Sequence, residues 1–385
     1  MIGRRRQVAL VLTAVLATAA ACANLERQHS SRNVAPAPGA TPARGFTLVA
    51  TGSIVPQDSV VDRASYDAAG IGYDFRPMLS GAGPAVRGAD LALCHLDAVY
   101  ATVVGRRASS SAHVPPQIAQ DLVATGYDGC ATASDHALDD GAPGIRLTLD
   151  AMDEAGLRHA GTARTEDEAR YLTVYQAGPA RIAHLSYTFG TGGHPLPAGQ
   201  PWAVSLIDPK RVIGDARAAR RSGADVVVVS VHWGTEGQDA PDPAQLDLAR
   251  RLTAATTGGR PDIDLILGTH AHVPQPYEKV NGTWVVYGLG DQIAGERADG
   301  RGTRDPRRTQ STLGRFTFAA PARPGGRWQV TRAEFVPQMY DVDAGRVVDV
   351  NRAIADGADL AGVRDRIRDV VLSRGAAADG LVMAE

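Results

Sequence analysis

The chain has 385 residues, with 40 lysines and arginines against 42 aspartates and glutamates, and a formal net charge of −2. This near balance gives no electrostatic case for binding nucleic acid, whose phosphates attract strongly basic proteins. The length and the 44% of hydrophobic residues predict one large domain with appendages, or two domains, with ample apolar side chains for a core.

The amino terminus carries a predicted export signal over residues 1–22. Arg4–Arg6 are basic, Val8–Ala21 form an apolar run too short to span a bilayer comfortably, and small residues precede Cys22. Ala19–Cys22 resembles a bacterial lipobox without its usual leucine, so Cys22 is a candidate for lipidation; ordinary cleavage nearby, with Cys22 incidental, is the alternative. We therefore expect an exported protein, either a lipoprotein on the extracytoplasmic face of the membrane or a secreted one.

The rest of the chain divides by composition. Residues 23–44 are polar and contain three prolines, which predicts a flexible linker. We expect the main domain at 45–340 and a C-terminal helical extension at 341–385, with one amphipathic helix over 347–373 and a frayed last dozen residues. Within the main domain, residues 297–308 are charged and glycine-bearing, which is typical of a mobile loop.

Apolar runs and helix-like segments alternate along the main domain. The runs that predict strands begin at Phe46, Ala89, Tyr127, Arg181, Val226, Asp264 and Thr283. The segments that predict helices, three of them followed directly by glycine, are 115–125, 144–155, 208–222 and 243–256. Later runs at 312–318 and 327–335 predict a hairpin around Pro324–Gly326. The alternation predicts a layered α/β core.

Imidazoles and carboxylates gather where several predicted strands end. Val226–Val231 stops at His232, the run at Asp264 leads into His270 and His272, and the run at Thr283 leads to Asp291. Ligands collect at the carboxyl ends of strands in open sheets, so these ends predict one site. His270 and His272 lie two apart in a tight turn, which lets both rings face one ion. The alternative is that they are solvated loop histidines.

The first half of the domain adds carboxylates to this set. Alternation places His95 and Asp97 on the same side of one strand, and the next strand leads to Asp135 and His136. Carboxylates with imidazoles suit Zn, Mn or Fe, and Asp97 is the best candidate to bridge two ions. The candidate metal ligands are Asp97, Asp135, His232, His270 and His272.

This ligand set indicates attack of metal-activated water on a phosphoester or a similar electrophile. His136 could donate a proton to the leaving group; its alternative role is to cap the helix near Gly144. No serine-hydrolase elbow, Walker motif or dinucleotide fingerprint is present.

Two cysteines and four further histidines of the main domain remain to be placed. Cys94 and Cys130 lie near the ends of predicted strands, and neighbouring strands would bring their Cα atoms within about 5–6 Å. They are candidates for a disulfide in an oxidising compartment, with two independent buried thiols as the alternative. His184, in the middle of a strand, is expected in the core. The histidines expected at the surface are His113, His159 and His194.

Five segments carry a resemblance to a known family: Ala89–Asp97, Ala133–Asp139, His232–Glu236, Gly268–His272 and Tyr287–Asp291. In this order they resemble the CapA-type poly-γ-glutamate capsule biosynthesis proteins, which are related to calcineurin-like metallophosphoesterases. The resemblance covers roughly residues 46–335. It implies a four-layer αββα metallophosphoesterase-like sandwich, an exported or membrane-attached protein, and a divalent transition metal.

The chain departs from the family pattern at five positions. Ser53 stands where the family usually has Asp, and His95 and Asp97 stand where it has Asn and Glu. Asp135 stands where it has Asn, and Asp291 where it tends to have Asn. By analogy, one metal position is completed by Asp97, Asp135, His232 and His270. The other rests on Asp97 and His272, with His95, Ser53, Glu236 and Asp291 as additional candidates. We predict one firm metal position and one weak or empty one.

Two functions compete. The first is an exported metal-dependent hydrolase acting on an envelope polymer or a phosphoester, in capsule or poly-γ-glutamate metabolism. The second is a non-catalytic metal-containing factor that binds or assembles a membrane polymer-synthesis complex; Ser53 favours this one. A purely structural envelope lipoprotein does not explain why so many polar strand ends converge.

Overall fold

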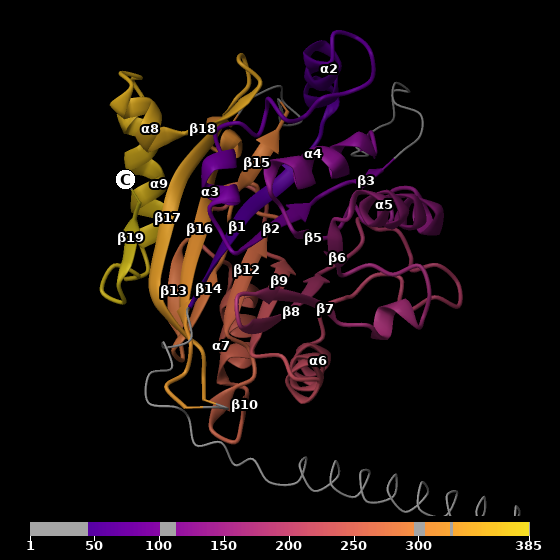
Figure 1. Ribbon diagram of the computed structural model, residues 1–385, viewed down its shortest axis with the longest axis vertical. Coiled ribbons are helices and arrows are strands. Elements are labelled where there is room, and N and C mark those ends of the chain that lie inside the picture. Colours follow the sequence, from indigo (N-terminus) through magenta and orange to yellow (C-terminus); the bar gives the residue numbers. More distant parts are fainter. Residues whose placement is uncertain (1–44, 101–112, 296–304, 324–325, 385) are drawn as a thin grey trace, which may run out of the picture. The chain divides into compact units, whose positions relative to one another are not determined.

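Two β-sheets packed face to face organise the fold (Figure 1). The computed structural model describes residues 45–100, 113–295, 305–323 and 326–384. The predicted export signal with Cys22, the predicted linker, residues 297–304 of the predicted loop and the tip of the predicted hairpin lie outside the described residues.

The first sheet has nine strands, in the order β18-β17-β16-β1-β2-β5-β6, with β15 also on β1 and β19 also on β17. Its centre is β1 (Phe46–Val55), which pairs in parallel with β2 and antiparallel with β16. The other strands are β2 (Leu91–Leu96), β5 (Gly129–Ala131), β6 (Arg158–Ala160), β15 (Asp291–Ala294), β16 (Gln310–Ala319), β17 (Gln329–Asp341), β18 (Arg346–Asp349) and β19 (Leu381–Met383).

The second sheet has six strands, in the order β13-β14-β12-β9-β8-β7. Its four central strands are parallel and almost wholly buried, which explains their continuous apolar runs. The strands are β7 (Thr173–Ala177), β8 (Ala180–Thr188), β9 (Val226–His232), β12 (Leu265–Thr269), β13 (Tyr277–Val280) and β14 (Thr283–Val286). Two small ribbons pair β3 (Val99–Tyr100) with β4 (His113–Val114), and β10 (Thr256–Thr257) with β11 (Arg260–Pro261).

Helices cover the outer face of each sheet. The first sheet carries α2 (Asp58–Asp67), α3 (Gly83–Arg87), α4 (Gln117–Thr125) and α5 (Gly141–Ala155), and the second carries α6 (Pro209–Arg221) and α7 (Pro243–Ala254). Two short 3₁₀ helices are η1 (Glu168–Arg170) and η2 (Pro306–Thr309). Between the sheets, Leu48 and Leu93 belong to the same apolar cluster as Val228 and Leu267. The predicted four-layer αββα sandwich is confirmed.

The predicted single helix over 347–373 is wrong. The segment begins as β18 and then forms two helices, α8 (Val350–Ala355) and α9 (Ala361–Leu372). Gly357, with φ of 100°, lies in the break between them, in a conformation that ends helices. The last residues are not frayed either, since β19 pairs in parallel with β17 and buries Leu381.

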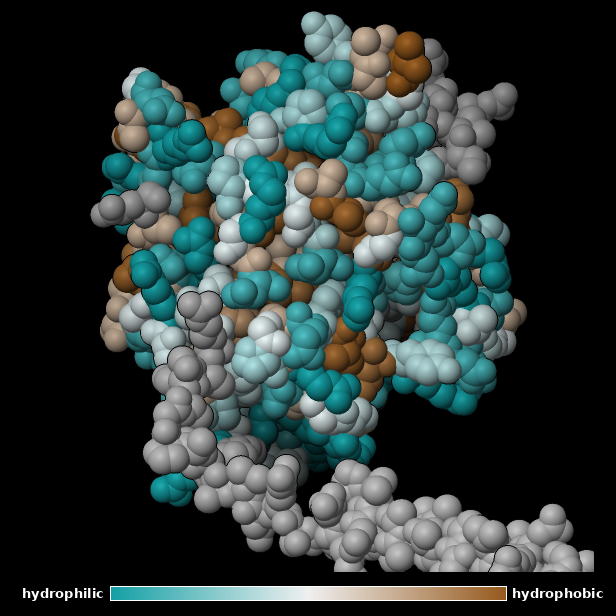
Figure 2. Space-filling view, in the orientation of Figure 1, coloured by the Kyte–Doolittle hydropathy of each residue, from teal (hydrophilic) through white to brown (hydrophobic). Residues whose placement is uncertain are grey.

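One face of the described part of the chain is largely polar (Figure 2). Figure 2 shows a mostly hydrophilic face on which apolar residues form scattered patches. Among the described residues, no helix combines the length and the apolar composition needed to cross a membrane.

Candidate metal centre

The polar strand ends predicted from the sequence meet where the two sheets come together. Asp97 and Asp135 follow β2 and β5 of the first sheet, and His232 ends β9 of the second. The turn after β12 supplies His270 and His272. Parallel strands place all these residues at carboxyl ends, and pairing of His232 with Thr269 brings the turn beside β9. The structure therefore brings all five predicted ligands together.

One group of ligand atoms surrounds His232. Its Nε2 lies 2.8 Å from Asp135 Oδ1, 3.9 Å from Asp97 Oδ1 and 3.1 Å from His270 Nδ1. Its Nδ1 lies 3.2 Å from Thr269 Oγ1. When Nδ1 donates its proton to Thr269, Nε2 presents a lone pair to the two carboxylates. Lone pairs this close repel unless a cation or a proton lies between them, so the geometry fits a metal ion.

The environment of Asp97 is a second indication that this site binds a cation. Its side chain is fully buried, and both carboxylate oxygens lack a hydrogen-bond partner among the described residues. Burial would raise the pKa of Asp97, but the neighbouring imidazoles, His232 first, outweigh it and lower the pKa, so the group is ionised. An ionised carboxylate without partners is costly in a protein interior unless it binds a cation.

The second group of ligand atoms centres on His272. Its Nε2 lies 3.9 Å from Asp97 Oδ2, and its Nδ1 lies 2.9 and 3.1 Å from the two oxygens of Asp291. A carboxylate behind an imidazole fixes the tautomer and orients the opposite nitrogen toward a metal. Asp291 is thus a positioning residue. Both His270 (φ 87°) and His272 (φ 56°) adopt left-handed backbone conformations, a strain of about 1–3 kcal/mol each that accumulates at functional sites.

Ser53 and His95 contact each other. Ser53 Oγ lies 3.2 Å from His95 Nδ1, and His95 Nε2 lies 3.5 Å from the carbonyl oxygen of Ala133. Burial, with repulsion from His232, lowers the pKa of His95 to about 3, so the ring is neutral. Its Nε2–H then donates to the carbonyl, and its Nδ1 accepts from the serine hydroxyl. With His95 bonded to Ser53 and Ala133, Asp97 and His272 remain the main described candidates for the predicted second metal position.

Glu236 lies at the edge of the cluster. Its side chain is 40% exposed, and Oε2 lies 3.0 Å from Arg308 Nη1. A carboxylate oxygen lies within 4.8 Å of ligand atoms of both His270 and His272. Glu236 can therefore reach the predicted second metal position if it gives up its ion pair with Arg308.

His136 also lies beside the ligands. One of its ring nitrogens is within 4.8 Å of carboxylate oxygens of Asp97 and Asp135. Its Nδ1 donates to Asp139 Oδ2 at 2.8 Å, and this hydrogen bond raises the pKa of His136 to about 9 against the opposing effect of burial. The ring is therefore protonated near neutral pH. The alternative role as a helix cap is wrong, because α5 begins at Gly141 with no side-chain cap.

Comparison with known proteins places this geometry in a family. A family model described as "Bacterial capsule synthesis protein PGA_cap" matches residues 47–296, a span that includes every site motif from Ser53 to Asp291. The chain belongs to this family. A PGA biosynthesis protein CapA of Bacillus subtilis is 33% identical over 164 residues, which are 42% of this chain and 41% of that protein. A probable polyglutamine synthesis accessory protein of Mycobacterium tuberculosis is 30% identical over 207 residues, 50% of this chain and 51% of that protein.

The chain spans about half the length, or less, of the two curated relatives named above. The chain spans 41% and 51% of the two named above, so their whole activities do not carry over directly. Among solved structures, a putative 5′-nucleotidase of Staphylococcus aureus has a TM-score of 0.45 at 16% identity, over 84% of this chain and 58% of that one. The NAD nucleotidase of Haemophilus influenzae has a TM-score of 0.44 at 12% identity, over 89% and 58%. With scores this low, the fold rests on the strand order itself.

The capsule synthesis family member also carries a disulfide beneath the site. Cys94 in β2 and Cys130 in β5 are paired in register, with Cα atoms 4.4 Å apart, and their sulfurs are bonded. The bond ties together the two strands that lead to Asp97 and Asp135.

His184, expected in the core, is buried as predicted.

Sequence reasoning missed three neighbours of the ligands. Thr269 and Asp139 orient His232 and His136, and both lie within or beside the motifs, where a polar residue near a ligand was the available signal. Phe189 carried no such signal. It follows β8, is 53% exposed, and its ring centroid lies 4.5 Å from that of His270. Only the tertiary structure brings it over the imidazoles.

Proposed function

We propose that this member of the capsule synthesis family is an exported, metal-dependent, phosphoesterase-like hydrolase in capsule, poly-γ-glutamate or other envelope polymer metabolism, with one weakened metal position. The observation that carries the proposal is the buried Asp97 carboxylate, unpartnered among the described residues and surrounded by imidazoles of both sheets. Residues 1–22 would direct export, with Cys22 as a lipid anchor or with release into the medium, and a polymer-synthesis complex at the membrane as partner.

Each side chain of the centre has its own role in this proposal. Asp97, Asp135, His232 and His270 would hold the first divalent ion, and Asp97 with His272 the weaker second one. A divalent ion, Mn, Zn or Fe by donor type, supplies a Lewis acid and an activated water when bound. Asp291 orients His272, and Thr269 orients His232. His136, held protonated by Asp139, would give its proton to the leaving oxygen.

Replacing His136 by glutamine tests the hydrolase. We expect the metal content to stay at the wild-type level and the rate of hydrolysis of bis(p-nitrophenyl) phosphate by the Mn²⁺-loaded protein to fall about 10²- to 10⁴-fold, the usual loss when a general acid is removed. His194→Gln is the matched control, since its Nε2 lies 3.8 Å from the other oxygen of Asp139 and its side chain is 50% exposed. Equal losses in both variants, or no hydrolysis by metal-loaded wild type, would contradict the proposal.

A specific contact favours the second function, a non-catalytic factor that keeps a metal and binds or assembles a polymer-synthesis complex. Ser53 offers a hydroxyl where the family usually has a carboxylate, and that hydroxyl bonds His95. A two-ion mechanism needs ligands for both ions. The loss of one carboxylate therefore supports a protein in which the metal stabilises a binding surface.

Restoring the carboxylate separates the two functions. In Ser53→Asp we expect a second equivalent of metal in the protein and a faster phosphoester hydrolysis, because the new carboxylate adds an anionic ligand beside His95. Metal is counted by inductively coupled plasma mass spectrometry, and Ser53→Asn serves as a control of similar size without the charge. A second equivalent without any gain in hydrolysis would favour the binding function.

A further inference from the structure

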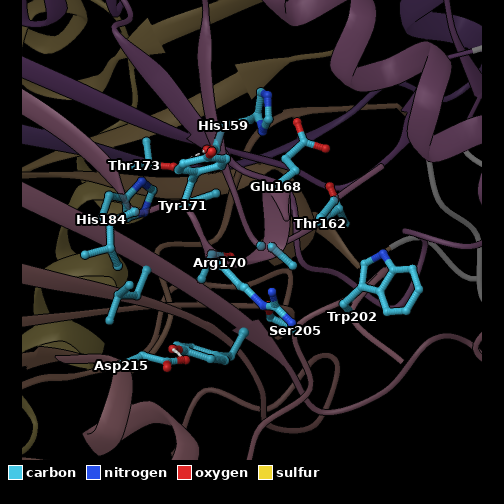
Figure 3. A pocket seen from close by; sticks show the side chains of 18 of the residues that line it. His159, Thr162, Glu168, Arg170, Tyr171, Thr173, His184, Trp202, Ser205 and Asp215 are labelled. Atoms are coloured by element: carbon cyan, nitrogen blue, oxygen red, sulfur yellow. Dashed lines mark hydrogen bonds between the residues drawn. The ribbon is translucent and has the colours of Figure 1, made fainter. Parts of the chain in front are cut away.

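A pocket with its own lining lies at the edge of the second sheet (Figure 3). It has a volume of about 770 Å³, within the range of roughly 300–1,000 Å³ typical of small-molecule sites. Its walls come from β6, the segment 161–174 with η1, the carboxyl half of β8, the segment 202–205 and α6. None of the five predicted ligands lines it.

Two buried polar atoms of this pocket lack partners. His184 is 1% exposed, and its Nε2 is 2.8 Å from Ser230 Oγ, but its Nδ1 has no hydrogen-bond partner among the described residues. Trp202 Nε1, also buried, is likewise unpartnered there. A neutral imidazole and an indole N–H each bond a partner when they can, because an unsatisfied buried polar atom carries a free-energy cost. Both atoms therefore point to a polar ligand.

The charges of the pocket are balanced. Three of its arginines are already paired with carboxylates of the same walls, so a polyanion would have to displace existing partners. The pairs are Arg164 with Asp153 and Glu168, Arg170 with Glu166, and Arg211 with Asp215. The fourth arginine, Arg158, donates to the carbonyl oxygen of Val174 and lies over the ring of Tyr175. The lining therefore favours an uncharged ligand rich in hydroxyl groups.

Aromatic rings frame the same pocket. Figure 3 shows Tyr171 and Trp202 on different sides of it. Tyr171 is 80% exposed, so its ring face is accessible to a ligand that enters the pocket. The hydroxyl-bearing Thr162, Thr173 and Ser205 line the space between the walls. Flat apolar rings combined with many hydrogen-bonding groups match a sugar, which has an apolar ring face and equatorial hydroxyls.

We propose that this pocket binds a neutral sugar unit, which stacks on Tyr171 and accepts or donates hydrogen bonds at Trp202 Nε1 and His184 Nδ1. None of the proposed contacts is a candidate ligand of the metal centre. It lies close to the metal centre, because Ser186 lines the pocket and Thr188, two residues on, pairs in register with His232. Two residues of a strand span about 7 Å. A bound glycan could therefore extend toward the ligand cluster.

The test is titration of the full chain with three neutral trisaccharides, maltotriose, cellotriose and triacetylchitotriose, and with tri-γ-glutamate as the anionic comparison, by calorimetry and saturation-transfer NMR. We expect saturable binding of at least one trisaccharide, weakened about tenfold or more by Tyr171→Ala and by Trp202→Phe, which removes only the N–H. Tyr66→Ala is the matched control, because Tyr66 is 75% exposed and lies on α2, outside the pocket.

Three results would overturn the proposal: no trisaccharide binds, binding is insensitive to both pocket variants, or tri-γ-glutamate binds in a manner that depends on Trp202. Tyr171 is exposed, so its loss leaves the core intact even if Trp202→Phe unfolds part of the pocket. The measurement is made with and without metal. Equal binding in both conditions separates this site from the proposed hydrolase centre.

Discussion

Replacing Asp97 by asparagine is expected to abolish metal-dependent stabilisation while leaving the metal-free protein at least as stable as wild type. The amide keeps the shape of the carboxylate but removes a buried charge whose two oxygens lack partners among the described residues. Without metal, that charge costs several kcal/mol in desolvation, so removing it relieves the fold. With metal at about a thousand times its Kd, wild type gains about 4 kcal/mol, and the variant should gain none of it.

The measurement combines metal content by mass spectrometry with thermal unfolding in the presence and absence of Mn²⁺ or Zn²⁺. Wild type should hold about one or two equivalents and Asp97→Asn none, with His270→Ala losing the same metal. Asp128→Asn is the control: Asp128 accepts from the backbone N–H of Ala92 near the other end of β2, at 2.8 Å. It should destabilise both forms and keep the metal. Metal-free wild type under replete conditions would refute the site.

Replacing Cys94 and Cys130 together by alanine is expected to lower the free energy of unfolding by about 4 kcal/mol. The disulfide joins residues with a sequence separation of 36, and the entropy of closing a loop of that length in the unfolded chain corresponds to about 4 kcal/mol. Both residues are buried in the apolar cluster of the first sheet, so alanine adds a small cavity cost. Urea unfolding at neutral pH measures the loss.

The same variant should bind metal more weakly. Cys94 adjoins His95, and Cys130 lies five residues before Asp135, so without the cross-link the spacing of β2 and β5 is held by backbone hydrogen bonds alone. Wild type treated with tris(2-carboxyethyl)phosphine should unfold like the double variant, and the double variant should not respond to the reductant. Free thiols at Cys94 and Cys130 in the unreduced, denatured wild type, located by alkylation and peptide mass spectrometry, would contradict the bond.

Local signals explain why the ligands could be predicted. His232, His270 and Asp97 each follow a short apolar run, and a strand buried on both faces needs such a run whatever its neighbours are. The carboxyl end of a parallel strand is where a polar side chain can reach a ligand. The same logic placed α4, α5, α6 and α7 to within a few residues, because glycine or proline marks their ends.

The predictions that the structure contradicts concern segments whose conformation depends on contacts with residues distant in the chain. The apolar spacing over 347–373 fits a helix, but β17 has an edge available for β18 at the start of this segment, and pairing with it overrides the local pattern there. The tilted ring contact of Phe189 with His270 and the hydrogen bond between Ser53 and His95 likewise join segments far apart in the chain. Such contacts leave no periodic signal in one sequence.

The sequence by itself determined the class of fold and the five candidate ligand positions, because strand and helix patterns and the chemistry of single residues are local properties. The family resemblance indicated the missing carboxylate at Ser53. Only the tertiary structure decided that His232 faces Asp97 and Asp135 across the two sheets, that Asp97 is left without partners among the described residues, and that a polar pocket opens beside β8. These features depend on the distances between residues that are remote in the chain and on which side chains become buried. Both are set only when the two sheets pack together.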